Sequence, residues 1–249
     1  MKKIFVILFI TLTSYSASAQ LFNKEKILNN ENFDKDRFSW GYFLGFNHYG
    51  FKIDYKEELT DANGRDVTDI QIKTKLGFSV GLLGNMRIND YLDLRFEPGL
   101  YISNRELIFP EENFQALGIS YNETYLHREV KSTYVHFPLL VKFSAKRLNN
   151  FKPFVVGGFS TSLNLNSNQD NPNDNSNGQF RMKKSTFYYE LGVGIDFYLH
   201  YFKFTPSIRG VFALNDELVP DNAVDGASPW TDNIESLKTR GVFINFTFQ

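Results

Sequence analysis

The sequence predicts an all-β protein, an eight-stranded up-and-down transmembrane β-barrel with long extracellular loops. Three observations favour this fold class: eight segments alternate apolar and polar residues, the connections between them alternate in length, and the chain opens with an export signal. Alternation with a period of two places successive side chains on opposite faces of a strand. A soluble barrel would turn its apolar face inward and a membrane barrel would turn it outward. The direction in which the polar face points, inward or outward, therefore distinguishes a membrane barrel from a soluble one.

The first three segments carry two distinct faces. In residues 39–47, "SWGYFLGFN", aromatic residues and leucine alternate with glycine and polar residues. Residues 70–83, "IQIKTKLGFSVGLL", give the clearest alternation, and residues 91–103, "YLDLRFEPGLYIS", oppose leucines to charges. β-branched and aromatic residues in such a pattern are typical of half-buried strands.

The next three segments continue the pattern. Residues 132–144, "STYVHFPLLVKFS", set valine, phenylalanine and leucine against histidine and lysine. Residues 153–165, "PFVVGGFSTSLNL", are ambiguous in phase, so both assignments of their faces stay open. Residues 186–199, "TFYYELGVGIDFYL", oppose apolar residues to glutamate, glycine and aspartate.

The last two segments complete an even number of strands. Residues 201–214, "YFKFTPSIRGVFAL", place Lys203 and Arg209 opposite phenylalanines, and residues 239–249, "TRGVFINFTFQ", end the chain. Long polar connections follow the odd strands, and short turns follow the even ones. This layout is typical of outer-membrane barrels, whose long loops are extracellular.

The N-terminal residues 1–19 have the features of a secretory signal peptide. Lys2 and Lys3 precede an apolar run from Ile4 to Leu12, and Ala17-Ser18-Ala19 resembles a cleavage site. The run is shorter than the roughly 20 residues of a membrane-spanning helix. We expect residues 20–38 to form a periplasmic N-terminal segment and residues 39–249 to form the barrel in the outer membrane.

The composition excludes several functional classes. The chain has no cysteine, which removes disulfides, thiolate metal sites and lipoprotein attachment. A net charge of −1 argues against a nucleic-acid partner. The 13 Tyr and 26 Phe favour strands and suit the aromatic girdles of a membrane barrel. Removal of the signal peptide leaves about 230 residues, enough for a single barrel domain.

Glycines and charges occur mainly on the same face of the strands. Glycine weakens a strand exposed to solvent, but inside a narrow barrel it makes room for long side chains. Gly210 departs from this trend. Both signs of charge occur on this face, as an interior would need, because an unpaired buried ion is costly. We therefore predict an interior charge network of Lys73, Lys75, Asp93, Arg95, Glu97, Lys142, Glu190, Asp196, Lys203 and Arg209.

Three prolines argue against regular strand pairing. Pro98, Pro138 and Pro206 fall in mid-strand, where proline cannot donate to the ladder, so we expect bulges or local irregularity there.

At the C-terminus, the spacing of four residues is similar to an insertion signal of outer-membrane barrels. These are Thr239, Gly241, Ile244 and Phe246.

Two stretches resemble a known family of small outer-membrane barrels. "STYVHFPLLVKF" followed by "KPFVVGGFS" looks like the paired-strand pattern of proteins related to PorT, and residues 31–55 look like the N-terminus and first strand of PorT/SprT proteins. The resemblance implies a role in the type IX secretion system and, in gliding bacteria, in motility. It implies no catalytic residues and no cofactor.

Few residues suggest a chemical site. His127 with Glu129 is the one candidate for a catalytic pair, as an outer-membrane hydrolase or acyltransferase would need near its extracellular rim. Oxygen-rich loops at 61–66 and 170–174 could suit Ca²⁺, but neither completes a twelve-residue ligand pattern. Eight strands leave an interior that side chains can fill, so we expect a plug, with a conduit as the alternative.

These observations predict a non-enzymatic outer-membrane barrel needed for assembly or operation of the type IX secretion apparatus. The alternatives are a generic surface barrel with structural or ligand-binding loops and an outer-membrane hydrolase or acyltransferase. Expected partners are outer-membrane lipid and lipopolysaccharide, other secretion components, and the barrel-assembly machinery during insertion. One hypothesis is that residues 20–38 and the short turns contact the secretion components; the alternative is that these N-terminal residues are disordered.

Overall fold

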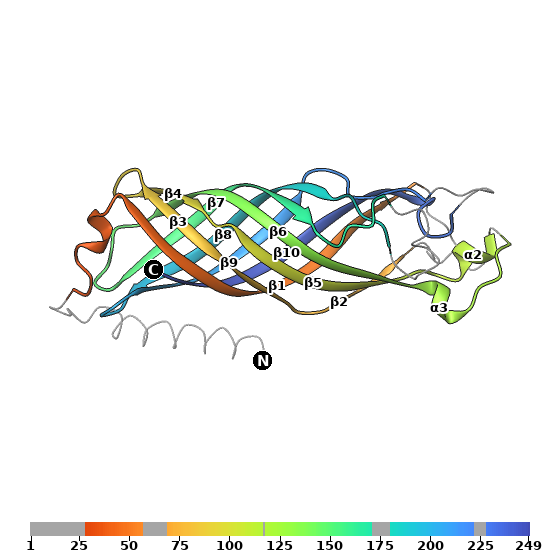
Figure 1. The fold of residues 1–249 in the computed structure, drawn as a ribbon, viewed down its shortest axis with the longest axis horizontal. Coiled ribbons are helices and arrows are strands. Elements are labelled where there is room, and N and C mark those ends of the chain that lie inside the picture. Colours follow the sequence, from red (N-terminus) through yellow and green to blue (C-terminus); the bar gives the residue numbers. More distant parts are fainter. Residues whose placement is uncertain (1–27, 57–68, 117, 171–179, 222–227) are drawn as a thin grey trace, which may run out of the picture.

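The computed structural model describes residues 28–56, 69–116, 118–170, 180–221 and 228–249. The predicted signal peptide lies outside these residues. Within them, ten antiparallel strands wind around a long cylinder (Figure 1). No helix in the described ranges is long and apolar enough to cross a bilayer.

The strands follow the chain around the cylinder, except that β2 with β3 and β4 with β5 each share one position. All pairings are antiparallel; β6 pairs with both β4 and β5, and β1 pairs with both β10 and β3, so the pairings among the described strands form a complete circuit. The strands are β1 (Phe38–Tyr55), β2 (Gln71–Thr74), β3 (Gly77–Arg87), β4 (Leu92–Phe96), β5 (Gly99–Ile108), β6 (His127–Ser144), β7 (Phe151–Asn164), β8 (Ser185–Tyr198), β9 (Lys203–Ala213) and β10 (Ile234–Phe248).

The ten strands correspond to the eight predicted segments, because two segments are interrupted. β2 and β3 together form the second, and β4 and β5 form the third. The interruption at Glu97–Pro98 has a local cause. Pro98, and Pro138 on β6 opposite Glu97, both lack the N–H that the ladder needs, although their carbonyls accept bonds from Leu82 and Glu97, respectively. The predicted irregularity at Pro98 is therefore confirmed.

The other two prolines differ in their effect. Pro138 stays within the continuous strand β6, and its missing donor faces the interruption between β4 and β5. At Pro206, the ladder between β8 and β9 is interrupted. The residue pair Gly194–Ser207 is followed by the pair Phe197–Phe204, so the proline has no paired residue in β8. Irregularity at Pro206 is confirmed, whereas Pro138 leaves its own strand and the register with β7 regular.

The interruption between β2 and β3 reverses which face points inward. β2 pairs Gln71 with Ile108 in β5, while β3 pairs Phe78 with Ile102, a shift of register by one residue. A shift of one residue moves side chains to the opposite face. Ile70 is therefore buried, although Phe78 on the same sequence parity is exposed.

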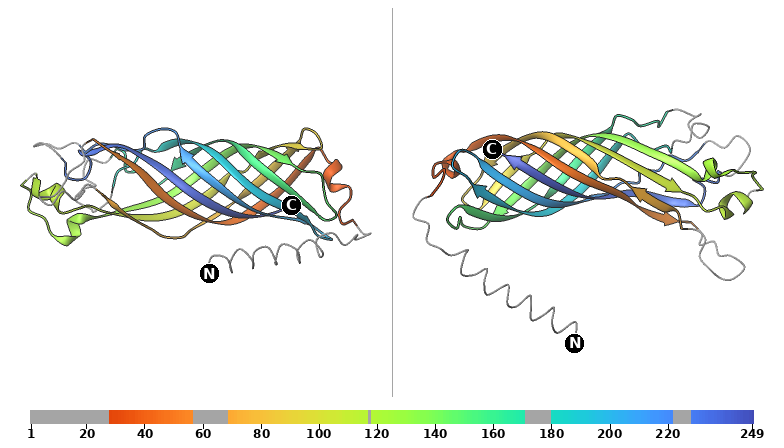
Figure 2. Two further views of the ribbon diagram at one scale, coloured as in Figure 1. Left: turned by 180° about the vertical axis from the view of Figure 1, so that it is seen from behind. Right: turned by 90° about the horizontal axis from the view of Figure 1, so that it is seen from below.

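The two ends of the barrel differ. The short turns, the C-terminus and the 3-10 helix η1 (Phe33–Lys35) lie at one end, which we call the short-turn end. Figure 2 shows the described parts of the long connections, with α2 (Glu112–Ala116) and α3 (Glu123–Leu126), at the opposite, long-loop end. This arrangement agrees with the predicted alternation of connection lengths.

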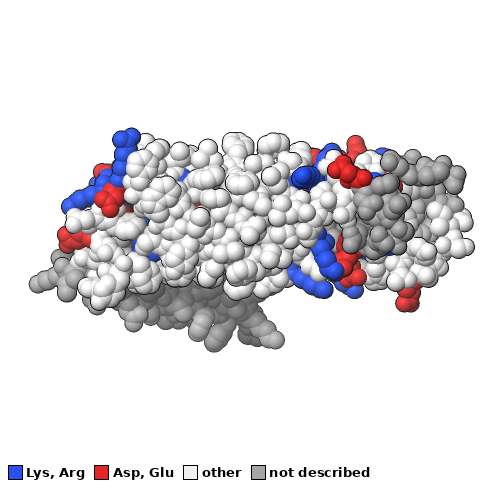
Figure 3. Space-filling view, in the orientation of Figure 1, with Lys and Arg blue, Asp and Glu red and all other residues white. Residues whose placement is uncertain are grey.

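The outer wall is apolar between two charged rims. Leucine, valine, isoleucine and phenylalanine side chains on alternate positions are exposed around the cylinder, for example Leu82, Leu191 and Phe159. Figure 3 shows this white belt on the face in view, with most of the lysine, arginine and acidic residues towards its two ends. An exposed belt of this kind is the signature of contact with acyl chains.

The interior is filled in three layers. An ionic layer lies nearest the short-turn end, followed by an aromatic cluster of Phe43, Tyr49, Tyr101, Tyr134, Tyr188 and Phe243. The third layer, nearest the long-loop end, is apolar. It consists of Ile70, Leu107, Phe109, Phe114, Leu126, Val130, Phe180, Met182, Leu218, Ile234 and Leu237.

Candidate functional site

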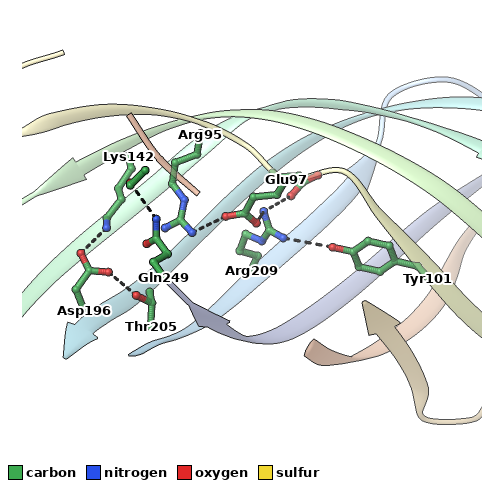
Figure 4. A network of polar contacts seen from close by, with 10 residues as sticks. Arg95, Glu97, Tyr101, Lys142, Asp196, Thr205, Arg209 and Gln249 are labelled. Atoms are coloured by element: carbon green, nitrogen blue, oxygen red, sulfur yellow. Dashed lines mark hydrogen bonds and ion pairs between the residues drawn. The ribbon is translucent and has the colours of Figure 1, made fainter. Parts of the chain in front are cut away.

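The ionic layer begins with an arginine that binds two glutamates. Arg209 Nη1 lies 3.0 Å from Glu97 Oε2 and 3.3 Å from Glu190 Oε2. Arg95 Nη2 reaches the other oxygen of Glu97 at 2.6 Å (Figure 4). All four side chains are buried. Each charge therefore has an opposite charge beside it, which offsets part of the cost of removing ions from water.

A second cluster lies nearer the short-turn end. Lys142 Nζ is 2.5 Å from Asp196 Oδ2, and the hydroxyl of Thr205 donates to the other oxygen of Asp196 at 2.7 Å. Lys203, also buried, lies close enough to Asp196 to interact with it electrostatically. Gly192 leaves room for Arg209 and Gly194 leaves room for Phe154, since an added Cβ would lie 2.5 Å from Cγ of Arg209 and 2.4 Å from Cζ of Phe154, respectively.

The structure buries seven of the ten predicted network residues inside the barrel. The seven are Arg95, Glu97, Lys142, Glu190, Asp196, Lys203 and Arg209. Asp93 lies on the inward face of β4 but is only half-buried at the short-turn end. Lys73 and Lys75 are exposed, so an interior position is wrong for both. The register shift between β2 and β3 causes this, because it turns Ile72 inward and the lysines outward.

The predicted charge network omits three buried interior groups. His136 Nε2 lies 2.7 Å from Glu190 Oε1, and both side chains are fully buried. Arg105 donates to the hydroxyl of Tyr134 at 2.6 Å and stacks over Phe51 at 4.0 Å. Glu217 lies in the connection between β9 and β10, and its side chain is buried. Arg105 continues the parity of Arg95 and Glu97, so extending the third strand would have found it.

Glu217 forms a buried acceptor site at the long-loop end. Its Oε1 accepts the backbone N–H of Thr239 at 2.8 Å, and its Oε2 accepts the Thr239 hydroxyl at 3.0 Å. Burial removes the carboxylate from water and raises the pKa of Glu217, against the lowering effect of these bonds and of Arg105. These hydrogen bonds with Thr239 attach the connection between β9 and β10 to the mouth of the barrel.

The N-terminal segment closes the short-turn end. The hydroxyl of Tyr198 donates to both oxygens of Asp34, at 2.6 and 2.8 Å. The side-chain amide of Asn29 donates to the Tyr198 carbonyl at 3.1 Å, and the Arg147 guanidinium binds the Asn29 carbonyl. The Phe33 ring lies under Lys203, with Nζ 4.4 Å from its centroid. We call residues 29–36 the N-terminal latch.

A shallow cleft lies beside the latch. It has a volume of about 450 Å³ and is lined by Lys35, Arg37, Met86, Arg87, Ile88 and Asn89. The Arg87 guanidinium is paired with Asp90, while Ile88 is exposed. The cleft therefore presents positive charge beside apolar side chains at the short-turn end.

The histidine singled out from the sequence has a different partner from the one predicted. His127 Nδ1 lies 2.7 Å from Glu106 Oε1, whereas Glu129 binds Lys131 at 2.8 Å and Asn104 at 3.2 Å. Among the described residues, no hydroxyl group is hydrogen-bonded to His127. The pairing with Glu129 is wrong, because β5 and β6 place Glu106 nearer the ring.

The remaining predicted features are placed as follows. Thr239 and Gly241 point inward, and Ile244 and Phe246 point outward. The oxygen-rich loop at 61–66 lies outside the described residues, as does Asp174. Where side chains are described, no group of three histidines or carboxylates is placed to hold a metal ion.

Comparisons with known proteins give one family match and several structural likenesses. Residues 18–219 match the family model described as "Outer membrane protein beta-barrel domain". No curated protein sequence matches the chain.

Three solved structures illustrate the likenesses of fold. OprG from Pseudomonas aeruginosa is 12% identical, with 84% of this chain and 94% of that chain covered and a TM-score of 0.44. The Neisserial surface protein A is 9% identical, covering 85% and 98%, with a TM-score of 0.39. Ail of Yersinia pestis is 9% identical, covering 84% and 96%, with a TM-score of 0.36.

Proposed function

Because this chain belongs to the outer membrane protein beta-barrel domain family, we propose that it acts as a non-enzymatic, closed component of the outer membrane that supports type IX protein secretion. Its location is the outer membrane, with the short-turn end in the periplasm and the long-loop end outside the cell. The proposal combines this location with the resemblance of residues 31–55 to PorT/SprT proteins and of residues 132–143 and 152–160 to the wider family of barrels related to PorT.

The observation that carries the proposal is the filled interior. Ionic, aromatic and apolar layers succeed one another along the axis, and the N-terminal latch covers the periplasmic mouth. A barrel filled in this way can contact partners through its outer surfaces. The side chains that fill its lumen hold the strands together. Secreted proteins would therefore pass by another component of the apparatus.

The periplasmic face supplies a surface for such a partner. The cleft between Lys35, Arg37, Met86 and Ile88 combines cationic and apolar groups, and the latch holds its N-terminal side in place. An acidic, partly apolar segment of a secretion component would complement it, since opposite charge steers and orients association. This cleft is where we place the contact that the sequence suggests for residues 20–38 and the short turns.

The test is the secreted-protein profile of a deletion strain. We expect loss of cargo export, restored by the wild-type gene and not by the double variant Lys35→Glu/Arg37→Glu. The matched control is Lys183→Glu, which changes a partly exposed lysine at the long-loop end and should restore export. Membrane levels of each barrel are measured in parallel, so that loss of insertion is recognised.

Two outcomes would contradict the proposal. Unchanged export in the deletion strain would favour a generic surface barrel. Loss of a lipid-modifying activity in a His127→Ala strain, with export intact, would favour an outer-membrane hydrolase or acyltransferase. Affinity capture from mildly solubilised outer membranes then identifies which secretion components bind the periplasmic face.

A further inference from the structure

Three cations lie together on the outer face of the seam between β1 and β10. Lys52 in β1 is directly opposite Lys238 in β10, and Arg240 is opposite Gly50. Because residues two apart share a face, Lys238 and Arg240 project on the same side. Like charges directly opposite each other destabilise a sheet. A sheet that keeps this arrangement has room for an anion between the cations.

The local carboxylates do not neutralise the cluster. Asp54 Oδ1 binds Lys52 Nζ at 2.5 Å, and Asp54 Oδ2 accepts the Ser236 hydroxyl at 2.9 Å. In the part of the chain that the structure describes, no carboxylate lies within ion-pair distance of Lys238 or Arg240. Among the described residues, Lys238 and Arg240 therefore have no ion-pair partner and can bind an external anion.

Gly50 leaves the centre of the cluster bare. A Cβ added there would meet no atom nearer than 3.8 Å, the carbonyl oxygen of Arg240. Packing therefore does not require glycine at this position. Its lack of a side chain leaves the outer face of β1 uncovered between His48 and Lys52, beside Arg240.

The position along the barrel defines the chemistry of the ligand. Towards the periplasm, the same two strands expose Leu44, Phe46, Val242 and Ile244, which belong to the apolar belt. Charged side chains reappear at the long-loop rim of that belt (Figure 3). A ligand bound here has an acyl part alongside the belt and an anionic head at its outer boundary.

We propose that Lys52, Lys238 and Arg240 bind the phosphate of a phosphorylated glycolipid in the outer leaflet. Lysine and arginine form short, charge-assisted bonds with phosphate oxygens, and clusters of basic residues at a membrane surface attract anionic headgroups. The site lies on the extracellular side and goes beyond the proposed function, because it concerns the lipid around the barrel and involves no secretion component.

The experiment uses the complete mature protein purified in detergent. Native mass spectrometry measures binding of bisphosphorylated lipid A and of the same lipid after its phosphates have been removed. For wild type, we expect preference for the phosphorylated form. For Lys238→Gln/Arg240→Gln, we expect its affinity to fall about tenfold, with binding of the dephosphorylated form unchanged. Gly50→Leu, which covers the bare face of β1, should weaken phosphate-dependent binding in a chain that keeps all three cations.

The matched control is Lys73→Gln, which removes another exposed, outward-facing lysine at the long-loop end. Its binding should equal that of wild type, and thermal unfolding checks that every variant is folded. Equal binding of both lipids by wild type would overturn the proposal. So would an equal loss in Lys73→Gln, which would indicate a diffuse charge effect, or equally tight binding of phosphatidylglycerol, which would indicate a general anionic-lipid surface.

Discussion

Arg209 Nη1 and Glu97 Oε2 are joined at 3.0 Å across the inside of the barrel, between strands that are not neighbours in the sheet. Glu97 lies between β4 and β5, while Arg209 lies in β9. The ion pair therefore connects opposite walls of the cylinder. Through Glu190 and Arg95 it extends into a network that braces the periplasmic half.

Arg209→Met should strongly destabilise the barrel. The change leaves Glu97 and Glu190 buried without their shared cation, and loss of one member of a buried ion pair costs about 3–5 kcal/mol. The free energy of unfolding in detergent, followed by tryptophan fluorescence over a urea series, measures the effect. Arg87→Met is the control, because the exposed pair of Arg87 with Asp90 should contribute less than about 1 kcal/mol. Similar losses in the two variants would contradict the bracing role.

Gly81→Val should overpack the aromatic layer. A Cβ at this position would lie 2.5 Å from Cε1 of Phe43 and 2.4 Å from the carbonyl oxygen of Pro98. Overpacking typically costs about 1–3 kcal/mol, here measured as a lower urea midpoint. Gly50→Ala should leave the midpoint unchanged, since its Cβ meets nothing nearer than 3.8 Å. A tolerated Gly81→Val would show that Phe43 repacks freely.

Glu217 should make barrel stability depend on pH. Burial raises its folded-state pKa, so the folded protein holds the proton more tightly than the unfolded chain. This contribution is fully present below the unfolded pKa and is lost as pH rises through the raised folded pKa. Relative to wild type, Glu217→Gln should therefore gain stability between mildly acidic and neutral pH. Urea unfolding of both proteins across that range tests this, and parallel curves would refute it.

Tyr198→Phe should loosen the N-terminal latch without unfolding the barrel. The variant loses the hydrogen bonds of 2.6 and 2.8 Å to Asp34, while the ring can keep its edge contact with Phe33. Hydrogen exchange of residues 29–36 should accelerate several-fold, and exchange in β6 and β8 should not change. Tyr201→Phe, at a tyrosine that is 89% exposed, serves as the control. Unchanged exchange in the latch would mean that Asn29 and Arg147 suffice to hold it.

Planar bilayers containing the purified protein should show no stable single-channel currents. The reason is physical: paired charges, packed aromatic rings and an apolar cluster occupy successive levels of the lumen. A water-filled porin provides the positive control. Reproducible conductance steps would restore the conduit alternative that the sequence leaves open.

The sequence by itself determined the eight segments, the alternation of loop lengths and most of the inward and outward faces. These follow from a period of two within each strand, which is a local property. For this reason the parity of Arg95, Glu97, Glu190 and Arg209 places them on the polar face of their strands, and the glycines and opposite charges on that face indicate that it points inward. The fold class follows in the same way, because an apolar outer face and a charged inner face fit a barrel in lipid.

Only the tertiary structure decided which groups meet and where the local pattern fails. The one-residue register shift between β2 and β3 turns Lys73 outward, although its parity predicts an inward position. The contact of Arg209 with Glu97 depends on how the strands are staggered around the cylinder, and the match of Asp34 to Tyr198 depends on where the N-terminal segment crosses the mouth. Stagger and crossing are properties of the closed barrel, and no single strand contains them.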